Sequence, residues 1–204
     1  AEISMQAFKL YQILYGNLPF TNISVTEQPV RGYGQSWPNL IFLPYDLFLD
    51  ATTRKSLGLQ ESSEEKEFFN IVAAHEMAHQ WWGHLVGWKT YHDQWLSEGL
   101  AMHASVLYLR QFEPKKWNNY WDLRRTWMFS RNASGRRPVD AGPVWLNAQL
   151  DAYEESSNSS LIYYKGTYIF EMLRAIMFDV KTADKRFMDM VRDFAATYAG
   201  KNAS

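Results

Sequence analysis

The residues with the clearest potential for chemistry in this sequence are two histidines and a glutamate in the stretch His75-Glu76-Met77-Ala78-His79. In a helix, side chains four residues apart lie on the same face, so both imidazoles can reach a single ion. Zinc accepts histidine nitrogens at about 2.0–2.1 Å. Glu76 is rotated by about 100° from His75, which places it beside the metal, within reach of a bound water. The pattern predicts a zinc site with Glu76 as its general base, and the alternative is a buried histidine pair on a core helix.

A catalytic zinc site needs a third protein ligand and one position left open for water. Glu98 follows His79 by 19 residues, in the first turns of the next expected helix. Two antiparallel helices with a short connection would bring it to the same point, and we expect one zinc per chain. Asp93 is a candidate for orienting a ligand imidazole through its second ring nitrogen, and a helix N-cap is the other role open to it. The remaining histidines do not share the metal spacing and are interpreted as packing or surface residues: His84, His92 and His103.

The elements that must position these residues can be inferred from periodicity and from turn residues. Apolar spacing predicts a helix over 3–15, and short β-branched or apolar runs predict strands at 23–25 and 40–43. The segment 31–38 between them is too rich in glycine and proline for a regular element. Ser62 and Glu65 form a candidate capping box. It would open a long helix to about residue 86, and further helices are expected over 93–112, 114–129, 160–178 and 183–199, with a loop over 131–160.

Strands gathered in the first quarter and helices in the rest predict a segregated α+β fold. Of the 204 residues, 47% are hydrophobic and 21% are charged, which is typical of a globular protein. The chain has no cysteine, which excludes disulfides and thiolate metal ligands, and its net charge of −1 favours neither nucleic acid nor an anionic membrane as a partner. No apolar run approaches the roughly 18 residues that would span a bilayer. The first residues carry no targeting segment, and the compartment stays open.

The motif resembles the M1 family of zinc aminopeptidases, in which His-Glu-x-x-His is followed after 18 residues by the third ligand, here Glu98. His79–Val86 and Asp93–Gly99 resemble the family's segments around these ligands, with His84 and Ser97 where asparagine is usual. The resemblance implies a thermolysin-like, mostly helical catalytic domain over 1–204. Residues 1–60 would hold a helix, short strands and a substrate-binding loop, and residues 61–204 the helical part with the zinc site.

The resemblance also assigns roles outside the zinc motif. Tyr163-Tyr164-Lys165-Gly166 is similar to the family's Tyr-x-Lys-Gly block, which gives Tyr163 the phenol that stabilises the transition state. Tyr164 is the main competitor for that role. Flanking N-terminal and C-terminal domains occur in the family, and we expect that they are missing from this chain.

One departure from the family affects the expected substrate, which is a peptide. The family's loop Gly-x-Met-Glu-Asn uses its glutamate to bind the free α-amine, whereas alignment on Trp37 places Gln35 there, after Gly32 and Gly34. A glutamine accepts a hydrogen bond but carries no negative charge. The leading hypothesis is an aminopeptidase. The alternatives are an endopeptidase or other zinc hydrolase without selectivity for a free amine, and a peptide-binding domain with weak or no turnover.

Overall fold

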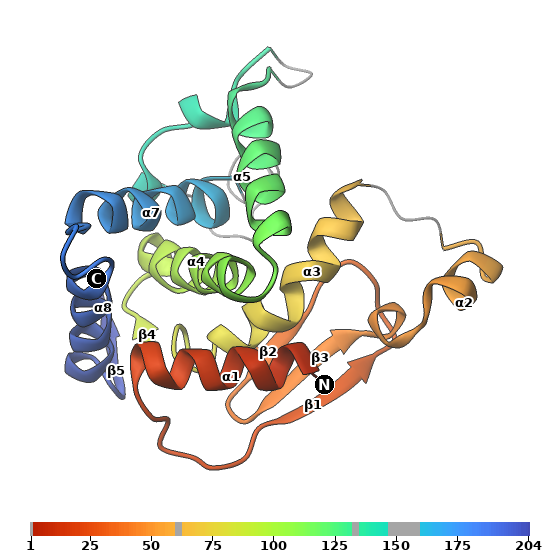
Figure 1. Ribbon diagram of the computed structural model, residues 1–204, viewed down its shortest axis with the longest axis horizontal. Coiled ribbons are helices and arrows are strands. Elements are labelled where there is room, and N and C mark those ends of the chain that lie inside the picture. Colours follow the sequence, from red (N-terminus) through yellow and green to blue (C-terminus); the bar gives the residue numbers. More distant parts are fainter. Residues whose placement is uncertain (1, 60–62, 132–134, 147–159) are drawn as a thin grey trace.

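Helix α4 (Gln94–Phe112) lies at the centre of the fold in this computed structural model, which describes residues 2–59, 63–131, 135–146 and 160–204 (Figure 1). The helix is buried continuously from Gly99 to Leu109. A helix that is buried on all sides needs apolar residues around its whole circumference, which is why no single apolar stripe marks it. The helices that pack around it are α3 (Ser63–Ala78), α5 (Pro114–Phe129) and α7 (Gly166–Met177).

A three-stranded sheet precedes these helices and consists of β1 (Ser24–Gln28), β2 (Gln35–Trp37) and β3 (Leu40–Pro44). β3 is the central strand, parallel to β1 and antiparallel to β2. The expected strands are confirmed, but the prediction that 31–38 is irregular is wrong for β2. Proline and asparagine form the tight turn into β3, and Asn39 adopts a φ of 66°, which asparagine tolerates. Because β3 lies between β1 and β2, β2 is an edge strand of this sheet.

The metal-motif helix is shorter than predicted, because α3 ends at Ala78 and not near residue 86. Gly83 has a φ of +117°, which a helix cannot contain, and the chain continues into strand β4 (Val86–Trp88). Gln80 is fully buried at this end and donates its amide to Ser36 Oγ at 2.7 Å and to the Trp37 carbonyl at 3.0 Å. These bonds fasten β2 to the end of the helix that carries both histidines.

The remaining elements complete the packing. Helix α1 (Glu2–Tyr15) contacts α3, and helix α8 (Lys185–Thr197) contacts α1 and α7. The helices expected near 3–15, 93–112, 114–129, 160–178 and 183–199 are all present, whereas helix α2 (Ala51–Ser56) and strand β5 (Lys201–Ala203) were not expected. β5 pairs in parallel with β4. The predicted cap at Ser62 and residues 147–159 of the predicted loop lie outside the described residues.

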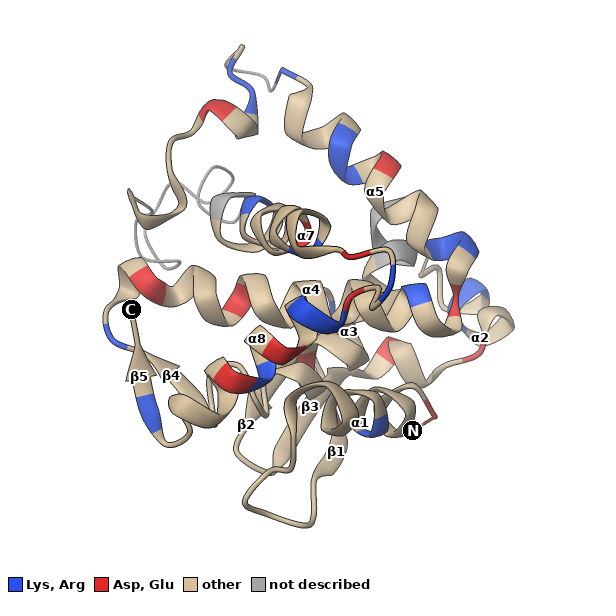
Figure 2. Ribbon diagram, turned by 60° about the vertical axis from the view of Figure 1, so that its left-hand side comes forward, with Lys and Arg blue, Asp and Glu red and all other residues tan. Residues whose placement is uncertain are grey.

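Charged residues of both signs are spread over the helices (Figure 2). This distribution agrees with the nearly neutral net charge of −1. Among the described residues, no helix has the length and apolar character needed to cross a membrane.

Candidate active site

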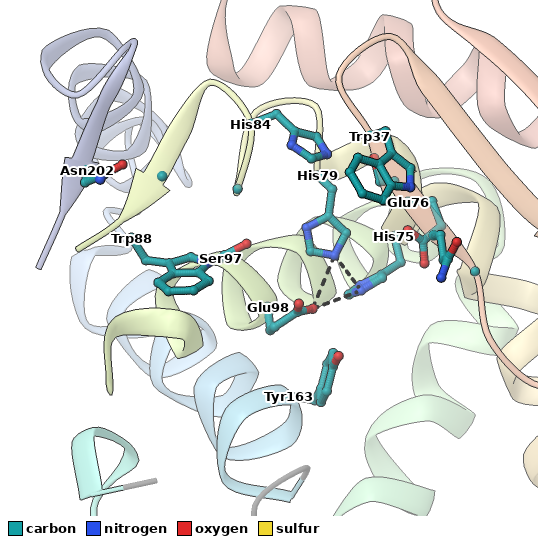
Figure 3. Close-up of a pocket in the computed structure, with 15 residues that line it drawn as sticks. Trp37, His75, Glu76, His79, His84, Trp88, Ser97, Glu98, Tyr163 and Asn202 are labelled. Atoms are coloured by element: carbon teal, nitrogen blue, oxygen red, sulfur yellow. Dashed lines mark hydrogen bonds and ion pairs between the residues drawn. The ribbon is translucent and has the colours of Figure 1, made fainter. Parts of the chain in front are cut away.

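His75, His79 and Glu98 converge on one point although they come from two helices (Figure 3). The Nε2 atoms of the two imidazoles are 3.0 Å apart, and they lie 3.3 Å and 3.2 Å from Glu98 Oε2. All three side chains are largely shielded from solvent. Helix α3 supplies His75, and His79 follows its last residue directly, one turn further on, where its amide still donates to the His75 carbonyl at 3.2 Å. Helix α4, which packs against α3, supplies the carboxylate. The sequence therefore predicted a cluster that the fold does bring together.

This arrangement fits a tetrahedral zinc ion. With bonds of about 2.0–2.1 Å, the ligand atoms of a tetrahedral site lie roughly 3.3 Å apart, close to the three separations found here. Burial by itself lowers the pKa of His79, but the Glu98 carboxylate more than compensates and the pKa is raised to about 9. Burial would raise the pKa of Glu98, yet the two histidines hold it well below its usual range. The environment of His75, His79 and Glu98 therefore stabilises positive charge between these three side chains.

The second ring nitrogen of each histidine is placed differently. His79 Nδ1 lies 2.8 Å from the Trp82 carbonyl, and since a carbonyl only accepts, Nδ1 carries a proton, which leaves Nε2 as the nitrogen that would bind a metal ion. His75 Nδ1 is buried without a hydrogen-bond partner among the described residues. The carboxylate of Asp93 instead accepts from the backbone amide and hydroxyl of Thr90, at 3.0 and 2.8 Å. The Trp82 carbonyl, and not Asp93, therefore contacts the His79 imidazole. Thr90 is the N-cap of a short 3₁₀ turn, Tyr91–Asp93, and Asp93 closes its capping box as the third residue. Asp93 also precedes α4, but its side chain makes no cap hydrogen bond to that helix.

Glu76 is buried beside the cluster and faces strand β2. Burial raises its pKa, and the neighbouring His75 and His79 partly offset that effect. Gly34 packs directly against it, because a Cβ atom on this glycine would lie 2.6 Å from Glu76 Oε1. Because residue 34 has no side chain, the Glu76 carboxylate fits beside the start of strand β2.

Tyr163 lines the cavity on the opposite side of the cluster from β2, with its ring centroid 6.0 Å from that of His75 (Figure 3). It lies in a π-helical turn, Ser160–Lys165, before α7. Gly99 of α4 and Gly166 of α7 permit this approach, since a Cβ on Gly99 would come within 3.1 Å of Gly166 Cα. Burial, followed by the negative charges of Glu98 and Glu76, raises the pKa of Tyr163 well above its usual value, so its phenol keeps its proton.

Tyr164, the competing candidate, points toward α5. Its ring meets the Trp127 ring edge-on with centroids 4.9 Å apart, and the guanidinium of Arg124 lies 4.1 Å from its ring centroid. These contacts favour Tyr163 for a role at the cluster.

A cavity of about 530 Å³ surrounds the cluster. Gly34 and Gln35 of the predicted substrate-binding loop line it, whereas Gly32 does not. Its walls also include Ser36 of the same predicted loop, and residues to which the sequence gave no role in the site: Trp37, Gly83, His84, Gly87, Trp88, Ser97 and Asn202. His84 was interpreted as packing or surface, and its Nε2 is buried without a hydrogen-bond partner among the described residues. Asn202 is revealed only by the fold, because β5 lies more than 100 residues from the zinc motif.

A His-Glu-x-x-His helix with a glutamate from the next helix in the same cluster defines an HExxH metallopeptidase site. The sequence model of the peptidase family M1 domain matches residues 39–204 of this chain. The chain therefore belongs to peptidase family M1.

Curated relatives agree with this assignment, and solved structures share the fold. Aminopeptidase N of Lactobacillus helveticus is 32% identical over 183 residues, which are 87% of this chain and 20% of the relative. Aminopeptidase M1-B of Oryza sativa subsp. japonica is 28% identical over 148 residues, 71% of this chain and 16% of the relative. The M1 zinc metallopeptidase from Deinococcus radiodurans has a TM-score of 0.64 at 20% identity, covering 99% of this chain and 38% of that one. Native yeast LTA4 hydrolase has a TM-score of 0.67 at 17% identity, covering 98% and 29%.

The fold is thus that of M1 zinc metallopeptidases, as the sequence predicted. The chain spans about a fifth or less of the length of these two curated relatives and less than two-fifths of the two solved chains.

Proposed function

We propose that residues 1–204 act as the catalytic domain of a zinc-dependent aminopeptidase that removes N-terminal residues from peptides. The observation that carries this proposal is the convergence of His75, His79 and Glu98 at 3.0–3.3 Å beside the buried Glu76. Membership of the M1 family supports it.

The three ligands would hold one zinc ion, which supplies Lewis acidity toward a water molecule and toward the oxygen of the scissile carbonyl. Glu76 acts as the general base, because its carboxylate is adjacent to the cluster and burial favours proton uptake. The proton that Glu76 takes from the attacking water is then passed to the leaving amine. The phenol of Tyr163 donates a hydrogen bond to the developing oxyanion, and its raised pKa keeps the donor intact.

The edge strand β2 is suited to orient the substrate. Its outer backbone groups can pair with an extended peptide, and its residues Gln35, Ser36 and Trp37 line the cavity. A peptide aligned in this way would run directly past Glu76, which packs against Gly34.

Glu76→Gln tests the proposal most directly. The amide keeps the size of the side chain but cannot accept the proton, so we expect zinc binding to persist while hydrolysis of an aminoacyl amide falls about 10²–10⁴-fold. Zinc content and turnover are measured on the same preparation. Undiminished turnover would contradict the role of Glu76.

Adjacent tyrosines provide a matched pair for the oxyanion role. Tyr163→Phe should lower turnover about 10²–10³-fold, the range for loss of one oxyanion donor. Tyr164→Phe should leave turnover near the wild-type value, since that ring packs on α5. Equal losses in both variants would argue against a specific role for Tyr163.

A second candidate function rests on the charges of the cavity. Among the described lining residues, the only carboxylates are Glu76 and Glu98, and both already have roles in the metal site. Gln35 therefore leaves the α-ammonium group without a dedicated anion, which favours hydrolysis of peptides with a blocked or extended N-terminus. Matched free-amine and N-acetylated peptides distinguish the two functions. We expect Gln35→Glu to shift preference toward the free amine by about tenfold, since charged hydrogen bonds are roughly twice as strong as neutral ones.

A further inference from the structure

One backbone carbonyl connects the two helices that carry the metal ligands. The Trp82 carbonyl accepts from His79 Nδ1 at 2.8 Å and also from the hydroxyl of Ser97 at 2.9 Å. Ser97 is buried on α4 and immediately precedes Glu98. The same oxygen is thus bonded to one metal ligand and to the residue next to another.

The segment that presents this carbonyl lies beyond the end of α3. The Trp82 amide still donates to the Ala78 carbonyl at 3.0 Å, but among the described residues no backbone amide donates to the Trp82 carbonyl, so side chains satisfy it. Gly83 follows with a φ of +117°. A Cβ atom there would lie 2.8 Å from Ser97 Oγ and 3.6 Å from His79 Nδ1. Glycine at residue 83 therefore permits both the backbone turn and the hydroxyl contact.

From these contacts we propose that Ser97 is a positioning residue for the metal site. Its hydroxyl fixes the Trp82 carbonyl, and this carbonyl holds the His79 ring with Nε2 toward Glu98. The inference rests on the proposed zinc site and deepens it.

Outer hydrogen-bond partners of metal ligands commonly contribute 10- to 100-fold to metal affinity. Ser97 acts one bond further away, so we expect Ser97→Ala to weaken zinc binding about tenfold, the lower end of that range. The dissociation constant is measured by competition with a chelator. The absorption spectrum of the cobalt-loaded protein reports ligand geometry directly and should change in this variant, which a purely structural role for the hydroxyl would not cause.

Ser105→Ala is the matched control. Ser105 is also a buried serine of α4, and its hydroxyl donates to a carbonyl, that of Ala101, at 3.0 Å. Its removal should leave zinc affinity and the cobalt spectrum unchanged. Equal effects of the two substitutions would overturn the proposal, because they would show only a general cost of deleting a buried hydroxyl from this helix.

Gly83→Ala offers a second test through the same contact. The added methyl group would displace the Ser97 hydroxyl, so zinc affinity should fall by a similar factor. In the double variant with Ser97→Ala the affinity should fall no further, because both changes remove one interaction. Gly142→Ala controls for backbone strain, since Gly142 has a φ of +114° with open space around it. Additive losses would contradict the proposal.

The wild-type protein separates this inference from the proposed function. Zinc binding by the wild type with equal affinity in Ser97→Ala would overturn the positioning role alone. Absence of zinc binding by the wild type would overturn both.

Discussion

Helix α4 takes part in two histidine–glutamate contacts of nearly the same length. In the first, Nε2 of His79 lies 3.2 Å from Glu98 of α4. In the second, Nε2 of His103 of α4 lies 3.1 Å from Glu171 of α7. Both pairs are shielded from solvent, and the two contacts differ mainly in what surrounds them.

Around Glu171, the protein supplies its own positive charge. Arg174 binds this carboxylate through two nitrogens, at 2.6 and 2.9 Å, and also binds Asp184 at 2.6 Å. Arg110 binds the other oxygen of Asp184 at 2.7 Å. The charges in this network balance within the chain.

At the cluster of Glu98, no arginine or lysine is among the described residues that line the cavity. The metal-binding atoms of His75 and His79 approach each other and the carboxylate around a common centre. A histidine–carboxylate contact is therefore not in itself a sign of a metal site. The sign is a convergent set of donors whose charge the protein does not balance, and this difference makes the comparison testable.

The largest expected effect comes from Glu98→Gln. Loss of a direct ligand should weaken zinc binding more than about 100-fold, the upper end of the effect of outer partners. Excess zinc at 100 times its dissociation constant should stabilise the wild-type protein by about 2.7 kcal/mol, and the variant should lose this gain. Calorimetric titration and thermal unfolding measure the two quantities. Glu171→Gln is the matched substitution in the other pair, and a comparable loss of zinc affinity there would contradict the comparison.

Arg174→Met should affect stability and leave zinc affinity unchanged. It leaves Glu171 and Asp184 without their main cation, and breaking a buried ion pair costs about 3–5 kcal/mol. Because the side chain of Glu171 is 20% exposed, we expect a smaller loss of about 2–3 kcal/mol in the free energy of unfolding. Urea denaturation measures it. Lys185→Met, which breaks the exposed pair with Asp189, should cost less than about 1 kcal/mol.

The same network should produce a distinct acid response. Burial would raise the pKa of Glu171, but its hydrogen bonds with Arg174 and His103 lower it from 4.5 to about 2. A lowered pKa in the folded state stabilises the protein above the unfolded value, and this contribution is lost as the pH falls from about 4.5 to 2. The stability difference between the metal-free wild type and Glu171→Gln should therefore narrow over that interval. A difference independent of pH would contradict the ion pairing.

The comparison also shows what the sequence was able to predict. His75, His79 and Glu76 could be predicted because helical spacing alone places them together, and Glu98 followed from two adjacent helices. The network of His103 could not, since Glu171 and Asp184 lie 68 and 81 residues away and carry no local pattern. His103 was nevertheless correctly interpreted as a packing residue.

Other errors have local physical causes. Apolar residues continue past Ala78, so the sequence predicted helix there, whereas α3 ends at Ala78 and Gly83 adopts a φ of +117° that a helix cannot contain. Strand β2 was missed because its pairing with β3 and its bonds to Gln80 are tertiary contacts. Roles of backbone atoms, such as the carbonyl of Trp82, are independent of residue type and leave no signal in the sequence.

Replacement of Asp93 has a small expected effect on stability. Its carboxylate accepts from the amide and hydroxyl of Thr90, the N-cap three residues before it. Asp50 is itself the N-cap of α2 and accepts from the amide and hydroxyl of Thr53, three residues after it, at 2.8 and 3.0 Å. Asp93→Ala and Asp50→Ala should each cost about 1 kcal/mol of stability, the usual value of a cap, and neither should change zinc affinity. Chemical denaturation and chelator competition measure these quantities.

Comparing the two variants separates the effect of location from that of losing the hydrogen bonds. Both aspartates accept from a backbone amide and a threonine hydroxyl, but only Asp93 is next to α4, the helix that carries Glu98. A tenfold loss of zinc affinity in Asp93→Ala alone would restore its predicted role beside a ligand imidazole. Unchanged affinity in both variants would leave the Trp82 carbonyl as the outer contact that orients the site.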